Sequence, residues 1–193
     1  MARLDTTRII DGYLTGQLLV AMPSMSDPRF ERTVIYLCAH SNGGALGLVI
    51  NRLAEHISFD DLLGQLNIPI SPHDDIRVHL GGPVEQARGF VLHSADYVRD
   101  NTLVVSPQIA LTASVDVLAA IASGHGPRRS LLALGYAGWG PGQLEAEIQQ
   151  NGWLQVPADD DLLFGSHIRT TWHRAMRKIG LDIAMLASTA GHA

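Results

Sequence analysis

The sequence predicts an α+β protein in which helices surround a mixed, strongly twisted β-sheet. Short apolar runs recur along the chain and are bounded by glycine and proline, which is typical of strands and turns. Several runs are paired as in hairpins, and the helical patterns fall between these pairs, so a regularly repeated βαβ winding is not indicated. The 193 residues can bury a sizeable core. We expect residues 1–193 to form a single domain, with room for a small additional lobe.

The clearest element is a β-hairpin within residues 27–51. Residues 33–39 are β-branched, aromatic and apolar, residues 45–50 form a second apolar run, and Asn42-Gly43-Gly44 lies between them. Neither arm alternates cleanly between polar and apolar residues, which indicates that both faces of the hairpin are covered. We therefore place it in the centre of the sheet.

The remaining strands are predicted to be short. Pro23 ends the first of them, and Gly81-Gly82-Pro83 forms a turn between the second and the third, which we expect to pair with each other. The predicted strands are residues 17–22, 77–80, 89–93, 103–106, 130–136 and 153–156.

Four segments have helical patterns, and their ends carry the expected signals. Ser58 with Asp61 resembles a capping box, Ser114 suits an N-cap, and Pro141 suits a first helical turn. Between the last two helices, residues 159–161 are expected to be an acidic loop. The predicted helices are residues 58–66, 114–123, 141–150 and 168–179.

Composition limits the classes of function. The formal net charge is -5 and the pI is about 5.9, so the chain has no overall attraction for nucleic acid or for an anionic membrane. Cys38 is the one cysteine, which excludes an intrachain disulfide. Residues 1–17 contain two aspartates and no continuous apolar stretch, and no apolar run in the sequence approaches the length of a membrane span. We expect a cytoplasmic protein with no membrane partner.

A ligand site is one interpretation of the glycine-rich stretch 135–142. It follows a predicted strand and opens a predicted helix, where backbone N–H groups can hold a phosphate. The candidate ligand residues are therefore Gly138, Trp139 and Gly140, with Arg32 and Arg88 as anchors for an acidic ligand. The alternative is structural: a tight turn that allows Trp139 to pack, and arginines that form ordinary surface ion pairs.

Cys38 is a second candidate, because the period of a strand places it on the same face as His40, where an imidazole could activate the thiol. The alternative is a small buried apolar residue. Histidines 40, 79 and 93 lie near predicted strand ends and would converge if those strands were neighbours, yet no metal-binding spacing supports this. We expect no metal and no cofactor.

Nucleic-acid binding and serine hydrolysis have weaker support. The last helix carries a basic face (Arg169, His173, Arg174, Arg177 and Lys178), but no second helix completes a helix-turn-helix motif. We therefore do not expect direct DNA binding. The sequence has no G-x-S-x-G motif, so it contains no sign of a nucleophilic serine, and we predict no catalytic residues.

Three separated motifs resemble the YqgE/AlgH family of bacterial proteins. They are PSMSDPRFERTVIYLCAHSNGGALGLVINR, HLGGPVEQARGFVLHS and LGYAGWGPGQLEAEIQQNGWL, in this order. The resemblance implies an α+β fold with a bifurcated, coiled sheet that forms a pseudo-barrel, and a cytosolic bacterial protein. Members are often labelled transcriptional regulators, and the resemblance brings no catalytic residue with it.

The function that we predict is regulation without catalysis, through contacts with a protein or a small ligand. The alternative is a protein that binds a nucleotide or a phosphorylated metabolite, with or without hydrolysing it, through residues 135–142 together with Arg32 or Arg88.

Overall fold

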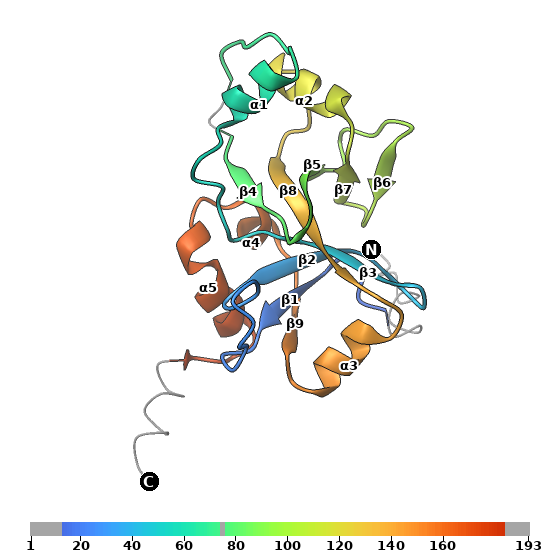
Figure 1. Cartoon of the computed structure of the whole chain (residues 1–193), viewed down its shortest axis with the longest axis vertical. Helices are drawn as coiled ribbons and strands as arrows, with labels where there is room; N and C mark the ends of the chain where they lie inside the picture. Colours follow the sequence, from blue (N-terminus) through green and yellow to red (C-terminus); the bar gives the residue numbers. More distant parts are fainter. Residues whose placement is uncertain (1–12, 74–75, 184–193) are drawn as a thin grey trace, which may run out of the picture.

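A curled sheet of nine strands forms the centre of the computed structural model, which describes residues 13–73 and 76–183 (Figure 1). The strand order is β6-β7-β5-β8-β3-β2-β1-β9, with β4 beside β8. The strands are β1 (Gln17–Ala21), β2 (Val34–Ser41), β3 (Gly44–Val49), β4 (Val78–Leu80), β5 (Val84–Ser94), β6 (Thr102–Val104), β7 (Ile109–Thr112), β8 (Ser130–Trp139) and β9 (Trp153–Pro157). The helices within the described residues are α1 (Phe59–Gln65), α2 (Val115–Ala122), α3 (Gln143–Gln149), α4 (Asp160–Phe164), the 3₁₀-helix η2 (Ile168–Thr170) and α5 (Thr171–Lys178). The predicted α+β class is confirmed.

The predicted hairpin is β2 and β3, and its central position is confirmed. A two-residue turn, Asn42-Gly43, joins the strands, and Ser41 pairs with Gly44 at its base. The hairpin lies between β8 and β1 in the sheet. Both faces of β2 are covered, since the run from Val34 to Cys38 is buried without interruption. A continuous apolar run thus corresponds here to a strand with packed layers on both sides.

The sheet divides along β8, whose two halves have different neighbours. The first half pairs with β4 in parallel, with Val78 opposite Leu132, while the second half pairs with β3. The predicted pairing of residues 77–80 with residues 89–93 is therefore wrong, because β4 and β5 each pair with β8 instead. Glycine makes this possible. The chain between β4 and β5 passes so close to β8 that a Cβ on Gly82 would lie 2.1 Å from the carbonyl carbon of Tyr136.

The helices cover the sheet in three hydrophobic clusters. Helices α1 and α2 pack on one face of β4, β5 and β8, α4 and α5 pack on the other, and α3 packs near β1 to β3. Successive residues of β8 alternate between the first two clusters: Leu131 and Ala133 face α4 and α5, whereas Leu132 and Leu134 face α1 and α2. This alternation decides which side chains of the neighbouring strand β4 face each layer.

Three further predictions need correction. The sequence analysis missed β7, a four-residue strand beside β6. The expected acidic loop is the start of α4, with Asp159 as its N-cap accepting a hydrogen bond from the Leu162 N–H. The expected glycine turn begins later than predicted, because Gly135 and Gly138 lie inside β8. β7 and the glycines of β8 gain their structure from neighbouring strands of the sheet, whereas the start of α4 follows from its local cap.

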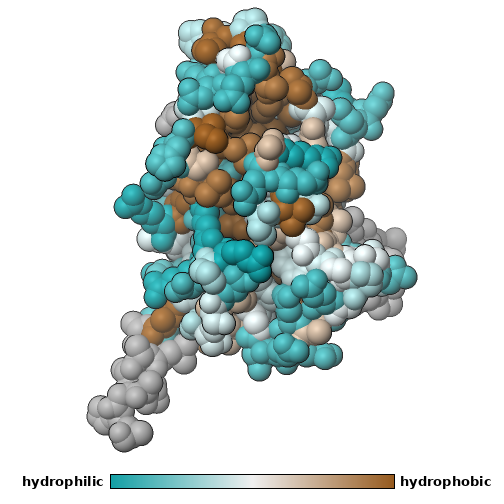
Figure 2. All heavy atoms as spheres, in the orientation of Figure 1, coloured by the Kyte–Doolittle hydropathy of each residue, from teal (hydrophilic) through white to brown (hydrophobic). Residues whose placement is uncertain are grey.

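The surface differs between the two ends of the molecule. Most of the large exposed apolar side chains lie in the half that carries α1, α2, β4, β5 and β6, which is the upper half in Figure 2. No helix within residues 13–73 and 76–183 combines the length and the apolar composition that crossing a bilayer requires.

Candidate anion-binding groove

An open groove with a volume of about 990 Å³ lies between the two helical layers, which is within the usual range for small-molecule sites. One wall is formed by β4 and the beginning of β8. The opposite wall is formed by residues 162–171, which include the end of α4 and all of η2, and residues 124–129 after α2 close one end. The groove therefore lies where the clusters of α1–α2 and α4–α5 meet.

His79 is the most buried titratable side chain of this groove. Because Val78 packs toward α1 and α2, its neighbour His79 faces the other side of the sheet, where α4 lies. The residue is only 6% exposed, and its Nδ1 makes no hydrogen bond of acceptable geometry. Burial lowers the pKa of His79 to about 4, and the charge of Arg77 acts in the same direction, while hydrogen bonds of the imidazole to the backbone of Arg77 and Leu132 partly oppose the shift. The imidazole is therefore neutral near pH 7.

Three arginines line the same groove, and the strand pairing explains why they gather. Arg77 immediately precedes β4, and Arg128 and Arg129 immediately precede β8. Because β4 and β8 are parallel, the residues before both strands meet at the same end of the sheet. The backbone of this end is fixed by the end of β5 and the residues after it, since Arg129 N–H donates to Ser94 Oγ and Arg128 N–H donates to Asp96.

Each arginine contacts a partner at the rim of the groove, but these contacts are exposed and leave the guanidinium groups accessible. Arg128 lies 3.5 Å from Asp96 Oδ2, and its side chain is 83% exposed. Arg129 pairs with Asp160 and is 51% exposed. Arg77 reaches across the groove, where its Nη1 is 3.5 Å from the carbonyl oxygen of Ser166. Exposed contacts of this kind contribute at most about 1 kcal/mol, so an incoming anion can replace them.

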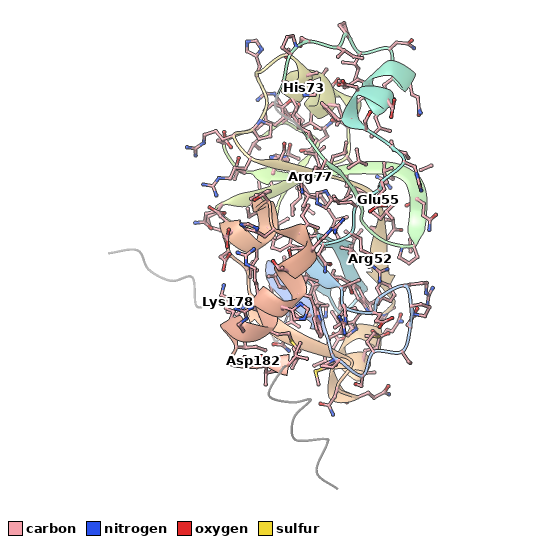
Figure 3. All side chains as sticks on the ribbon, turned by 90° about the vertical axis from the view of Figure 1, so that its left-hand side faces the viewer. Arg52, Glu55, His73, Arg77, Lys178 and Asp182 are labelled. Carbon is pink, nitrogen blue, oxygen red and sulfur yellow. The ribbon has the colours of Figure 1, made fainter. Side chains whose placement is uncertain are left out.

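The described residues that line the groove include no aspartate or glutamate. Asp74 and Asp75 lie outside the described residues. His73, also in the lining, is already bound to Asp60, with 2.8 Å between Nε2 and Oδ1. Figure 3 shows His73 at the α1–α2 end and Arg77 between that end and α5. The lining thus combines fixed positive charge with a neutral imidazole, which offers one hydrogen-bond donor and one acceptor.

The family becomes clear from a direct comparison with known proteins. A family model described as AlgH-like matches residues 18–184. The chain belongs to the AlgH-like family.

Curated relatives and solved structures agree with this. A UPF0301 protein of Rhodospirillum rubrum is 58% identical and covers 95% of this chain and 96% of its own length. Another, from Afipia carboxidovorans, is 56% identical, with 94% and 90% covered. The solution structure of the AlgH protein from Pseudomonas aeruginosa superposes with a TM-score of 0.76 at 42% identity over the whole of both chains. The predicted resemblance and its fold are therefore confirmed.

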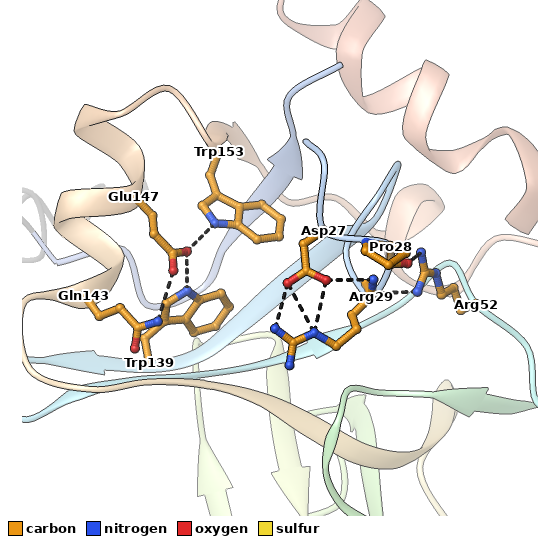
Figure 4. Close-up of polar contacts among 8 residues, drawn as sticks. All are labelled: Asp27, Pro28, Arg29, Arg52, Trp139, Gln143, Glu147 and Trp153. Carbon is orange, nitrogen blue, oxygen red and sulfur yellow. Dashed lines mark hydrogen bonds and ion pairs between the residues drawn. The ribbon is translucent and has the colours of Figure 1, made fainter. Parts of the chain in front are cut away.

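In this AlgH-like protein, Trp139 is part of a closed structural cluster. It is 7% exposed and packs edge-on against Trp153 at 6.0 Å between ring centroids. Both indole N–H groups donate to the same oxygen, Oε2 of Glu147, at 2.8 Å, as Figure 4 shows. Gln143 completes the cluster through Glu147 Oε1 and the Gly140 N–H. The carboxylate disfavours a second anion at Gly138, Trp139 and Gly140, so the geometry resembles the packing alternative more than the ligand alternative.

The two arginines expected to anchor a ligand do not line the groove of this AlgH-like protein. Arg32 lies over the ring of Trp172, 5.3 Å from its centroid, and Arg88 lies over Phe90 at 5.0 Å with Glu85 as its ion-pair partner. No described contact joins either arginine to Gly138 or Gly140. The structure therefore does not bring the five predicted ligand residues together in one site, and their role in binding stays a prediction. They are Arg32, Arg88, Gly138, Trp139 and Gly140.

Cys38 lies inside the core. It is 1% exposed, and its thiol faces the carbonyl oxygen of Tyr36 at 3.7 Å. Burial raises the pKa of the thiol to about 12, so the thiolate that a nucleophile needs does not form at neutral pH. The apolar alternative describes this residue.

The three strand-end histidines also separate. His40 binds Glu145, His93 binds Thr112 inside the core, and only His79 lines the groove. Within residues 13–73 and 76–183 no group of three metal-binding side chains is present. Sequence reasoning singled out His79 but missed Arg77, Arg128 and Arg129. The sequence does show basic residues directly before β4 and β8. This pattern predicts a shared basic site only once the two strands are known to be parallel neighbours.

Proposed function

We propose that this AlgH-like protein is a non-catalytic regulatory protein that binds a small anionic ligand in the groove of His79. The observation that carries the proposal is the gathering of Arg77, Arg128 and Arg129 at the end of the groove where the parallel strands β4 and β8 begin.

The charge pattern supports an anion. The protein has a net charge of -5. The lining of the groove differs from this overall charge, because its described residues include three arginines and no carboxylate. Guanidinium groups bind carboxylates and phosphates in bidentate fashion.

On this proposal the protein regulates by contacting a partner protein and not by binding DNA. The basic face of α5 is partly neutralised, since Arg174 pairs with Asp161 and Lys178 pairs with Asp159. We also infer a cytoplasmic location, which the single, buried cysteine supports.

A thermal-shift titration at low, fixed salt tests the binding step. The probes are citrate, inorganic phosphate, pyrophosphate and AMP, and a ligand at about 100 times its Kd should add about 2.7 kcal/mol to the stability of the folded state. We expect at least one probe to raise the melting temperature in the wild type and much less in Arg77→Gln/Arg129→Gln. Arg29→Gln/Arg99→Gln is the matched control, because it also removes two positive charges, from residues that lie over Phe30 and Tyr97 outside the groove. Equal shifts in the groove variant and the control would overturn the proposal.

A further inference from the structure

The carboxylate of Asp160 is paired with one of the arginines at the basic end of the groove. Asp160 lies in the first turn of α4, and its partner is the guanidinium of Arg129, just before β8. The pair joins the two walls of the groove, because Leu162 of the same helix is part of the opposite wall. Arg77 makes a second bridge, to the carbonyl oxygen of Ser166. An anion that approaches Arg129 therefore meets a carboxylate that is already in place.

The two neighbours of Asp160 in the sequence are bound elsewhere. Asp159 pairs with Lys178, and Asp161 pairs with Arg174. Both cations belong to α5, so these two carboxylates fasten α4 to α5. Of the three consecutive aspartates, Asp160 is the one whose described partner lines the groove.

Asp96 also touches the basic end, but it is part of the backbone framework there. Its carboxylate accepts hydrogen bonds from Ser94 Oγ and from the Arg128 N–H, and it lies 3.5 Å from the guanidinium of Arg128. Among the contacts of the described residues, the carboxylate of Asp160 has only the guanidinium of Arg129 as its partner, and 55% of its side chain is exposed. It can therefore leave Arg129 without breaking a hydrogen bond to the backbone.

A tethered carboxylate competes effectively with anions from solution. Because α4 holds Asp160 next to Arg129, the pair forms without the loss of translational freedom that the binding of a separate anion costs. Its weakness is its single charge, which pairs with one of the three arginines that line the groove. A phosphate or a polycarboxylate has more acceptor oxygens and can contact several guanidinium groups at once, so it can displace the aspartate.

We propose that Asp160 is an internal competitor for the anion site: it pairs with Arg129 in the absence of ligand and yields this arginine to the anion that binds. The inference rests on the proposed function and adds a regulatory contact to the same site. Because the two partners exclude each other at Arg129, the anion weakens the contact of α4 with the start of β8 by the factor by which Asp160 weakens anion binding. Occupancy of the groove is thereby coupled to α4, which is fastened to α5.

Isothermal titration calorimetry with pyrophosphate and citrate at low, fixed salt tests the competition. We expect Asp160→Asn to bind both anions about two- to fivefold more tightly than the wild type, which is the range that an exposed ion pair explains. The factor should be similar for the two anions, because the same competitor is removed. Asp161→Asn is the matched control, since it removes the same charge from the next residue of α4, whose partner Arg174 does not line the groove. An equal gain in both variants would indicate general repulsion and would overturn the inference.

The variant Arg129→Gln makes the test specific to one contact. Without the guanidinium, Asp160 has no arginine to occupy, so the addition of Asp160→Asn to Arg129→Gln should leave the anion affinity unchanged. A gain as large as in the wild-type background would overturn the inference. If Asp160→Asn binds the anions no more tightly than the wild type, while Arg77→Gln/Arg129→Gln binds them more weakly, the proposed function stands and the competitor falls. If neither anion binds to the wild type or to Asp160→Asn, or if the loss of both arginines changes nothing, both fall.

Discussion

His40 on β2 and Glu145 on α3 are joined by a hydrogen bond of 2.9 Å between Nε2 and Oε1, although 105 residues separate them in the sequence. The side chain of His40 is 1% exposed and that of Glu145 is 43% exposed. On the other side of the ring, Nδ1 accepts a hydrogen bond from the Leu14 N–H at 3.0 Å. Because Nδ1 is an acceptor, the proton is on Nε2 and points at Glu145. The contact ties the central hairpin to the helix beyond β8.

This contact predicts a small dependence of stability on acid pH. The pKa of Glu145 is lowered from its ordinary value of 4.5, mainly by its own backbone N–H and secondly by His40. A lowered pKa in the folded state contributes stability above pH 4.5 that is lost as the pH falls through the folded value. Glu145→Gln should therefore cost less than about 1 kcal/mol at pH 7 and less again at pH 3, since the side chain is exposed. Urea unfolding at both pH values checks this, and an equal cost at both would contradict it.

Glu147 should contribute more to stability than Glu145. Its Oε2 accepts from the indole N–H groups of Trp139 and Trp153, whose residues are 7% and 3% exposed. Glu147→Ala leaves both donors without a partner, so we expect a loss of about 2 to 4 kcal/mol in the free energy of unfolding. Glu147→Gln keeps an acceptor oxygen and should lose less. A loss for Glu147→Ala below that for Glu145→Ala in the same urea titration would show that the cluster is not the strong contact that its geometry indicates.

Much of the fold was readable from local patterns, because these patterns act within a few residues. The two-residue turn of the hairpin and the capping box of α1, in which Ser58 and Asp61 bond each other's backbone, both follow from short-range chemistry. Ser114 shows the limit of such signals. It occupies the predicted N-cap position of α2, but its hydroxyl forms no hydrogen bond there.

The pairing of β4 could not be predicted in this way. Whether residues 78–80 lie beside β5 or β8 depends on close backbone contacts at Gly81 and Gly82, and a local pattern does not encode partners. The groove shares this limitation, because Arg77 and Arg129 become neighbours only through the parallel register. For the same reason, the sequence placed the ligand site at Gly138 and Gly140. In the structure Gly138 is part of β8, and Gly140 is part of the turn before α3.

Cys38 should resist thiol reagents in the folded protein. Burial raises its pKa to about 12 and hides the sulfur from solvent, so the reactive thiolate is scarce. We expect an aromatic disulfide reagent at pH 8 to modify one thiol in denaturant and almost none in buffer. Labelling in buffer at the rate of a free thiol would show that the β2 layer opens, and would restore Cys38 as a reactive candidate.

Two glycines should respond to alanine in opposite directions. Gly64 lies in α1 with open space around its Cβ position, so Gly64→Ala should stabilise the protein by about 0.5 to 1 kcal/mol. At Gly82, φ is +154° and the Cβ would meet the backbone of Tyr136 at 2.1 Å. Gly82→Ala should therefore cost at least about 3 kcal/mol. Thermal unfolding of both variants checks the pair, and a mild effect at Gly82 would mean that the connection between β4 and β5 does not pass against β8.

The stability of His79→Leu without ligand distinguishes a binding role from a structural one. In the free protein, the buried Nδ1 without a partner should cost about 1 to 3 kcal/mol. Leucine removes this cost and packs against Leu131 and Leu163 in the same groove, so we expect the variant to be as stable as the wild type or more so. His79→Gln, which keeps a polar group at the position, should gain less. If His79 were held by structural hydrogen bonds, both variants would instead melt at lower temperature, and differential scanning calorimetry separates these outcomes.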